Sequence, residues 1–166
     1  IAVRRDGRRF VNEADGYHDF VQALHAATPP YERAECWLIC DHTFLRRWGM
    51  GMAKPFPVPY RHWIRRGYLL KGRTIAELAA QCGIDAGGLS ATIARTNTDA
   101  ARGEDTAFNR GWSPYNRNQG DKSLSGNPNV AAIAKPPFYA VRVIPGSFGS
   151  FAGLATDKDA RVLSED

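Results

Sequence analysis

Two adjacent segments with complete helix start and stop signals constrain the fold of this chain most strongly. Thr74–Glu77 is a capping box that opens a helix, and Gly83 ends it. Asp85 can cap a second helix that ends at Gly103. The short link between them predicts a helical hairpin with a structural role. Its inward-facing apolar side chains are expected to be Ile75, Leu78, Ala79, Leu89 and Ile93.

Short strands are expected on both sides of this hairpin. The continuous apolar run Cys36–Cys40 is typical of a buried strand, and residues 137–144 form a second strong strand pattern. Residues 1–12 predict a β-hairpin that turns at Asp6-Gly7, and residues 154–163 predict another. The fold class is therefore α+β, with small antiparallel hairpins and a buried strand packed with several helices.

The other elements follow from shorter signals. Asp15 or Gly16 opens a helix that Pro29 ends, and Asp41 can cap a short helix that contains Leu45. Residues 60–66 predict another short helix and residues 68–71 a short strand. In a chain of 166 residues, these elements are enough for one ordinary domain with its own core.

Two irregular segments interrupt the pattern. Residues 49–60 are rich in Gly and Pro and are interpreted as a mobile loop, which is where sites concentrate. Residues 104–136 are rich in Asn, Gly, Pro and Ser. Trp112 and Tyr115 stand out in this second segment as isolated aromatic anchors, so we expect it to be draped over the domain.

The net charge of +5 comes from arginine, which outnumbers lysine 17 to 5. Such a balance is compatible with a nucleic-acid-binding module or an anionic cofactor. The arginines are scattered, however, and those of residues 1–12 are expected to lie on the solvent face of the hairpin. A nucleic-acid partner is therefore not expected. No apolar run approaches the roughly 18 residues of a membrane helix, so no membrane span is expected.

The three cysteines Cys36, Cys40 and Cys82 form no disulfide framework. No histidine stands at a workable spacing from a second cysteine pair, so no zinc site is expected. Buried thiols in a reducing, cytoplasmic compartment are the preferred interpretation. The chain begins without a methionine or a signal peptide and stops just after a strand-like run, so we expect a fragment of a longer protein.

The segment Gly7–Glu13, followed four residues later by Tyr17, has the most chemical interest. A strand-forming run leads into Asn12 and Glu13 just before a helical pattern begins. Tyr17 is therefore expected at a strand-to-helix junction, where side chains project into clefts. Asn12 and Glu13 are expected to hydrogen-bond the turn that aims the tyrosine. Packing of Tyr17 against the core is the alternative.

Other catalytic patterns are missing from the sequence. No Gly-x-Ser-x-Gly motif surrounds Ser147 or Ser150, and no paired carboxylates share a helical face. Gly49-Met50-Gly51 lacks the third glycine and the following helix of a dinucleotide fingerprint. These observations disfavour a hydrolase and a complete dinucleotide-binding domain.

Several motifs, in their order along the chain, resemble one known superfamily. They are Gly7–Glu13 with Tyr17, Leu70–Ala79, the helix Asp85–Asn97, Pro136–Arg142 and Pro145–Asp157. Together they resemble the substrate (cap) domain of the fumarate reductase/succinate dehydrogenase flavoprotein superfamily. Within it they are most similar to the FAD-dependent 3-ketosteroid dehydrogenases, and the similarity runs over nearly the whole chain.

In that superfamily the cap domain is inserted between two halves of an FAD-binding domain. The resemblance therefore implies a cap domain over residues 1–153, with residues 154–166 starting the return hairpin into an absent FAD-binding domain. It also implies FAD as the cofactor of the full-length protein, held only weakly or not at all by this piece alone. The residues implied to bind the cofactor are Ser150, Phe151, Ala152 and Gly153.

Tyr17 stands where the superfamily divides. Fumarate reductases carry an arginine there, the proton donor to a dicarboxylate. Ketosteroid dehydrogenases carry a tyrosine, which removes a proton from carbon 2 of the steroid A ring while carbon 1 passes a hydride to the flavin. The resemblance thus implies that Tyr17 is a catalytic base and that the substrate is a 3-ketosteroid or similar apolar cyclic ketone. A soluble fumarate reductase is the alternative.

Two positions near the C-terminal end bear on this choice. Phe148-Gly149 stands where fumarate reductases carry a histidine, and the loss of that cation suits an apolar ketone better than a dicarboxylate. Residues 150–153 read Ser-Phe-Ala-Gly, whereas ketosteroid enzymes usually have Thr-Lys-Gly-Gly there. The resemblance therefore leaves the exact substrate open.

Overall fold

A single antiparallel sheet of four strands, in the order β1-β2-β4-β3, forms the centre of this computed structural model, which describes residues 1–146, 149 and 153–164. Strand β2 pairs with β1 through Ala2↔Leu38 and with β4 through Leu38↔Val141. Strand β3 closes the other edge against β4. The strands are β1 (Ala2–Val3), β2 (Cys36–Cys40), β3 (Leu69–Gly72) and β4 (Phe138–Val143).

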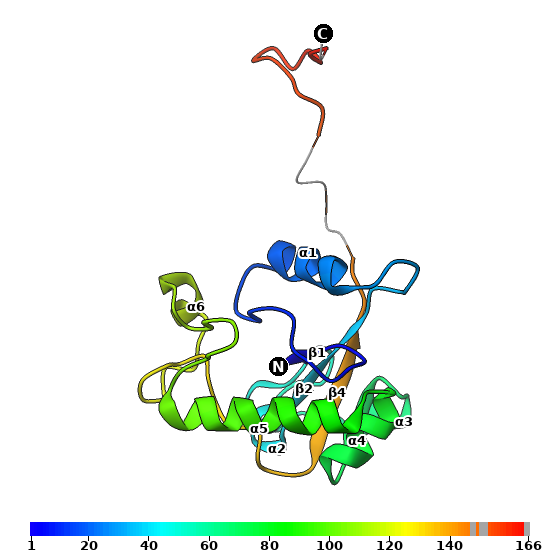
Figure 1. Ribbon diagram of the computed structural model, residues 1–166, viewed down its shortest axis with the longest axis vertical. Coiled ribbons are helices and arrows are strands. Elements are labelled where there is room, and N and C mark those ends of the chain that lie inside the picture. The colour runs from blue at the N-terminus through cyan, green and yellow to red at the C-terminus, as the bar shows by residue number, and fades with distance from the viewer. Residues whose placement is uncertain (147–148, 150–152, 165–166) are drawn as a thin grey trace.

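Helices lie on both sides of the sheet (Figure 1). In this view α5 crosses the lower ends of the strands and α1 lies above them, with α6 at the side. The helices are α1 (Tyr17–Ala27), α2 (His42–Trp48), α3 (Arg61–Arg65), α4 (Ile75–Cys82), α5 (Ala86–Arg102) and α6 (Pro114–Asn118). The architecture confirms the α+β fold class.

Two apolar clusters cover the two faces of the sheet, which explains why β2 is apolar at every position. Ile39 of β2 packs in one cluster with residues of α4 and α5, such as Leu78 and Leu89. Cys40, the next residue, packs in the other cluster with Leu45 of α2. Successive side chains of a strand point to opposite faces, so a strand buried on both sides has no polar positions.

The predicted helix caps are confirmed. The side chains of Asp41, Thr74 and Asp85 accept hydrogen bonds from backbone N–H groups in the first turns of α2, α4 and α5. Gly83 and Gly103 end α4 and α5 in the left-handed conformation, with φ of 67° and 70°. All three cysteines are buried free thiols, as expected. Among the described residues, no helix has the length and apolar character needed to cross a bilayer.

The predicted hairpin over residues 1–12 is wrong beyond its turn. Ala2 and Val3 pair with β2, and the Gly7 N–H donates to the Arg4 carbonyl at 2.9 Å, but no strand follows the turn. The turn packs against the start of α5, where the Asp85 N–H donates to the Arg5 carbonyl at 2.7 Å. One further bond of a hairpin is present, from the Arg4 N–H to the Arg8 carbonyl at 3.1 Å, but the pairing does not continue beyond it.

The expectation that aromatic side chains anchor residues 104–136 is also wrong. Trp112 and Tyr115 are 85% and 58% exposed. The segment is held to the domain by polar side chains instead, among them Asn116 and Asn127, which are 1% and 8% exposed. It also contains α6, which follows the cap residue Ser113.

The second predicted hairpin, over residues 154–163, forms around the bridge Thr156↔Val162.

Candidate active site around Tyr17

Tyr17 is the first residue of α1 and is 53% exposed. More than half of its surface is therefore open to other molecules, unlike that of a core aromatic residue. The segment that leads to it is irregular rather than a strand, so the expected strand-to-helix junction is a turn-to-helix junction. The N-cap residue of α1, Gly16, supplies no capping side chain.

Asn12 and Glu13 fix this junction, as predicted from the sequence. The Asn12 side-chain oxygen accepts a hydrogen bond from the Ala14 N–H at 3.0 Å. Glu13 accepts one from the Ala2 N–H at 2.8 Å, which ties the junction to β1. The two side chains therefore join the turn before Tyr17 to the edge of the sheet.

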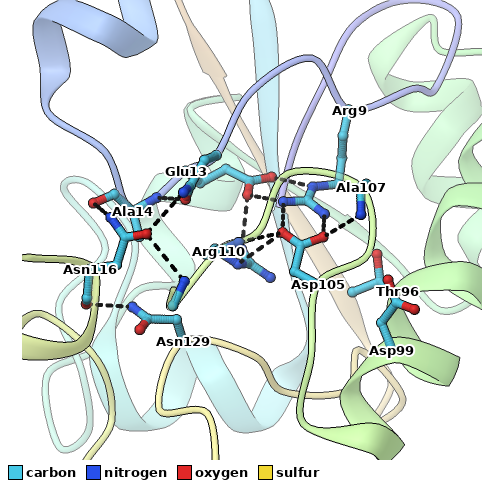
Figure 2. Close-up of polar contacts among 12 residues, drawn as sticks. Arg9, Glu13, Ala14, Thr96, Asp99, Asp105, Ala107, Arg110, Asn116 and Asn129 are labelled. Atoms are coloured by element: carbon cyan, nitrogen blue, oxygen red, sulfur yellow. Dashed lines mark hydrogen bonds and ion pairs between the residues drawn. The ribbon is translucent and has the colours of Figure 1, made fainter. Parts of the chain in front are cut away.

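Glu13 also belongs to a buried ionic cluster with Arg9, Asp105 and Arg110 (Figure 2). Arg9 lies between the two carboxylates, with its guanidinium 2.5 Å from a Glu13 oxygen and 2.8 Å from an Asp105 oxygen. Arg110 donates to Glu13 at 3.0 Å. The exposed fractions of these side chains are only 2–11%. Arg9 is therefore not on a solvent face, which corrects the expectation for this arginine, whereas Arg5 and Arg8 are exposed as expected.

The four charges of this cluster balance, and their titration follows from their contacts. Burial alone would raise the pKa of Asp105, but hydrogen bonds from Arg9 and the charges of Arg9 and Arg110 lower it to about 2. Burial would lower the pKa of Arg9, but its hydrogen bonds to Asp105 and Glu13 raise it above its usual value. The cluster is therefore fully ionised and electrically neutral at neutral pH.

Asn116 of α6 contacts the junction from the other side (Figure 2). Its side-chain oxygen accepts a hydrogen bond from the Asn12 side chain at 2.9 Å. Its side-chain nitrogen donates to the Ala14 carbonyl at 3.0 Å and to an Asp15 oxygen at 2.9 Å. The irregular segment 104–136 thus contributes Asp105, Arg110 and Asn116 to the contacts of residues 9–15, which precede Tyr17.

These three residues were missed by reasoning from the sequence. No short-range spacing links them to residues 9–15, since their hydrogen bonds span about one hundred residues of chain, as between Asn12 and Asn116. The richness of the segment in Asn was the only available signal, and it also fits a loop.

Of the residues expected to bind the cofactor, Ser150, Phe151 and Ala152 lie outside the described part of the chain. Gly153 is exposed, and no atom lies within 4 Å of the place where a Cβ would stand. Nothing in the described residues therefore closes around Gly153 as a cradle for FAD. The chemistry that can be derived for this chain is that of Tyr17 and its neighbours.

The chain thus forms an α+β domain, with helices packed on both faces of a small sheet. The half-exposed Tyr17 at the start of α1 forms one side of a candidate site. The chain belongs to the FAD binding domain family, whose sequence model matches residues 1–166.

Individual relatives cover the whole chain. It is 43% identical over 166 residues to a 4-oxocyclohex-2-ene-1-carboxylate 5-dehydrogenase of Sinomonas cyclohexanicum, covering 100% of this chain and 28% of that protein. A probable fumarate reductase, Ifc3, of Shewanella frigidimarina is 27% identical over 98% of this chain, which covers 23% of that protein.

A solved structure gives the same picture. The chain matches the crystal structure of a 3-ketosteroid delta1-dehydrogenase from Sterolibacterium denitrificans, in complex with 1,4-androstadiene-3,17-dione, with a TM-score of 0.91 and 38% identity. The match covers 99% of this chain and 30% of that one. The chain therefore spans less than a third of the length of these relatives.

Proposed function

We propose that this chain is the substrate-binding cap domain of a flavin-dependent oxidoreductase that introduces a double bond next to the carbonyl of a cyclic ketone. Residues 1–153 form the cap in this proposal, and residues 154–166 start the return into an FAD-binding domain outside this sequence. The proposal is supported by the family, by the TM-score of 0.91 to a ketosteroid dehydrogenase and by the coverage of less than a third of each relative.

Tyr17 is the proposed catalytic base. The observation that carries this role is a half-exposed phenol at a junction that Asn12, Glu13 and Asn116 fix with hydrogen bonds. A hydrogen on the carbon next to a carbonyl is acidic enough for a positioned base to remove. A bound flavin would supply the acceptor for the hydride that leaves the neighbouring carbon.

A tyrosine in water loses its proton only near pH 10, so a tyrosine base needs a positive field or a hydrogen-bond donor. The buried cluster at the junction carries no net charge to stabilise a phenolate, because two arginines there balance two carboxylates. In this proposal the groups that favour the phenolate and polarise the substrate carbonyl belong to the FAD-binding domain. The cap then contributes position rather than charge.

The relatives support two kinds of ketone. One dehydrogenase is named for a small cyclic oxo acid, and the solved structure for a 3-ketosteroid. The 43% identity to the first favours a cyclic oxo acid as the first substrate to test, with a 3-ketosteroid second. The lower identity of 27% to a fumarate reductase makes a dicarboxylate the weaker candidate. The buried free thiols support the expectation of a reducing cytoplasm.

Tyr17→Phe in the full-length protein tests this proposal. Turnover of the ketone that the wild type oxidises should fall by about 10²–10⁴-fold, because the phenyl ring keeps the shape and loses the base. Flavin content, measured by absorbance, should not change. Tyr115→Phe, another half-exposed tyrosine, is the matched control. Unchanged turnover in Tyr17→Phe would refute the role of the base, and reduction of fumarate instead of ketone oxidation would refute the substrate class.

A further inference from the structure

The side chain of Asn116 uses its whole hydrogen-bonding capacity. An amide side chain has two N–H donors and an oxygen with two lone pairs. The nitrogen donates to Ala14 and Asp15, and the oxygen accepts from the Asn12 side chain and, at 3.2 Å, from the Gly111 N–H. With an exposed fraction of 1%, Asn116 is a buried polar group with no unmet bond.

Three of these four bonds end on the residues that directly precede the N-cap of α1. They hold the side chain of Asn12, the carbonyl of Ala14 and the side chain of Asp15. A fully satisfied buried network of this kind specifies one local geometry, because any displacement leaves a buried polar group unpaired. The turn before Tyr17 is thus held in place by a residue 99 positions further along the chain.

Two further hydrogen bonds fix the backbone of Asn116. Its backbone N–H donates to the side chain of the α6 cap residue Ser113 at 3.1 Å. Its carbonyl accepts a hydrogen bond from the side chain of Asn129 at 2.8 Å. The amide therefore extends from a rigid support toward the junction.

The start of α1 needs such support because its own cap is weak. Helices commonly begin with a Ser, Thr, Asp or Asn side chain that binds a backbone N–H of the first turn. Gly16 occupies this position in α1 and makes no side-chain bond. The direction in which α1 leaves the turn is then set by residues 12–15 and by what holds them.

We propose that Asn116 is the positioning residue for Tyr17: it holds the turn that leads into α1, whose N-cap residue Gly16 has no side chain to do so, and thereby sets the direction of the phenol. This inference rests on the proposed function, in which Tyr17 removes a proton. It adds a long-range determinant of turnover on a segment that contacts the junction through hydrogen bonds and ion pairs. A displacement of about 1 Å in a reacting group can lower turnover by about 100-fold.

The test compares kcat and KM of Asn116→Ala in the full-length enzyme, with the ketone that the wild type oxidises. We expect kcat to fall about 10–100-fold, with KM within about threefold and flavin content unchanged. Asn97→Ala is the matched control, because Asn97 makes two similar hydrogen bonds, both to the backbone of Ile133 rather than to residues 12–15. Its kcat should stay within about twofold of the wild type.

A double variant separates positioning from general damage. In a Tyr17→Phe background, Asn116→Ala should cause no further loss of kcat, because a residue that acts through Tyr17 has nothing left to position. A second full loss would refute the inference. Equal kcat for Asn116→Ala and Asn97→Ala would also refute it, even if Tyr17→Phe is inactive. Unchanged turnover in Tyr17→Phe would refute the proposed function itself.

A donor–acceptor exchange keeps the test decisive if Asn116→Ala does not fold. Asn116→Asp places a carboxylate beside Asp15 and removes the hydrogen bonds donated to Asp15 and to the Ala14 carbonyl. It should lower kcat about as much as Asn116→Ala. Adding Asp15→Asn restores a donor and an acceptor between positions 15 and 116, though not the bond to Ala14, and should recover at least threefold of the lost kcat. Absence of recovery would refute the proposed contact.

Discussion

Removal of one charge from the buried cluster should open the segment that carries Asn116. Asp105 accepts two hydrogen bonds from Arg9, both at 2.8 Å, and its side chain is 2% exposed. It also accepts from the backbone N–H groups of Ala107 and Arg110 at 3.2 and 3.3 Å. Asp105→Asn keeps the volume of the side chain but replaces one acceptor with a donor that faces Arg9.

The size of this destabilisation follows from the pKa of Asp105. Its shift from 3.8 to about 2 corresponds to a stabilisation of about 2.5 kcal/mol by the ionised form. Since the buried cluster keeps one unpaired positive charge in the variant, the full cost should lie between about 2.5 and 4 kcal/mol. Because the folded pKa is depressed, this stabilisation is fully present above about pH 5 and is lost as the pH falls from about 4 to 2.

Hydrogen exchange measured by mass spectrometry on the full-length protein can detect this change locally. A loss of about 2.5 kcal/mol should speed exchange in peptides covering residues 105–111 about 70-fold at neutral pH. The control is Glu104→Gln, at the preceding residue. Glu104 is 53% exposed and pairs with Arg102 at 3.9 Å, so its loss should cost less than about 1 kcal/mol.

Two results would refute this reasoning. Exchange in residues 105–111 would be no faster in Asp105→Asn than in Glu104→Gln, or lowering the pH from 5 to 3 would leave wild-type protection of these peptides, corrected for the intrinsic exchange rate, unchanged. Either result would mean that the cluster does not hold the segment in the folded protein.

Two further predictions concern the fold. Gly7→Ala should cost about 2–5 kcal/mol in thermal unfolding, because φ is +73° and the new Cβ would stand 2.2 Å from the Leu89 nitrogen. Gly67→Ala, at φ +70° with nothing within 4 Å, should cost only about 1–2 kcal/mol, and equal losses would contradict the packing argument. Burial raises the pKa of the Cys36, Cys40 and Cys82 thiols to about 12, so these residues should resist iodoacetamide at pH 8 until the protein unfolds. Rapid labelling of the folded protein, mapped by mass spectrometry, would contradict this.

The parts of the fold that could be predicted from the sequence are those with local signals. The caps Asp41, Thr74 and Asp85 bind N–H groups three residues away, and the end glycines need only their own φ. The apolar run of β2 indicates burial on both faces without knowledge of its partners. Each of these signals lies within a few residues, so the sequence contains it completely.

The parts that could not be predicted depend on distant polar partners. In the sequence, nothing distinguishes Arg9 from a solvent-exposed arginine, because its partner Asp105 is 96 residues away. Trp112 is a large aromatic residue of the kind expected to anchor a loop, yet it is 85% exposed. Polar side chains such as that of Asn127 hold this segment instead. Hydrogen bonds between side chains distant in sequence follow no regular spacing, so the Asn-rich composition of residues 104–136 did not identify their partners.

Helix α1, which carries the proposed base, contributes little to the apolar core. Leu24 is the only buried residue of α1, and neither of the two main apolar clusters contains a residue of this helix. Apolar packing is not directional and tolerates small shifts, whereas hydrogen bonds to Asn12, Glu13 and Asn116 fix distance and angle. The helix that carries the proposed base is therefore attached at its start mainly by directional bonds. Substitutions in the apolar core should then change mainly stability, whereas substitutions in this polar network should lower turnover as well as stability.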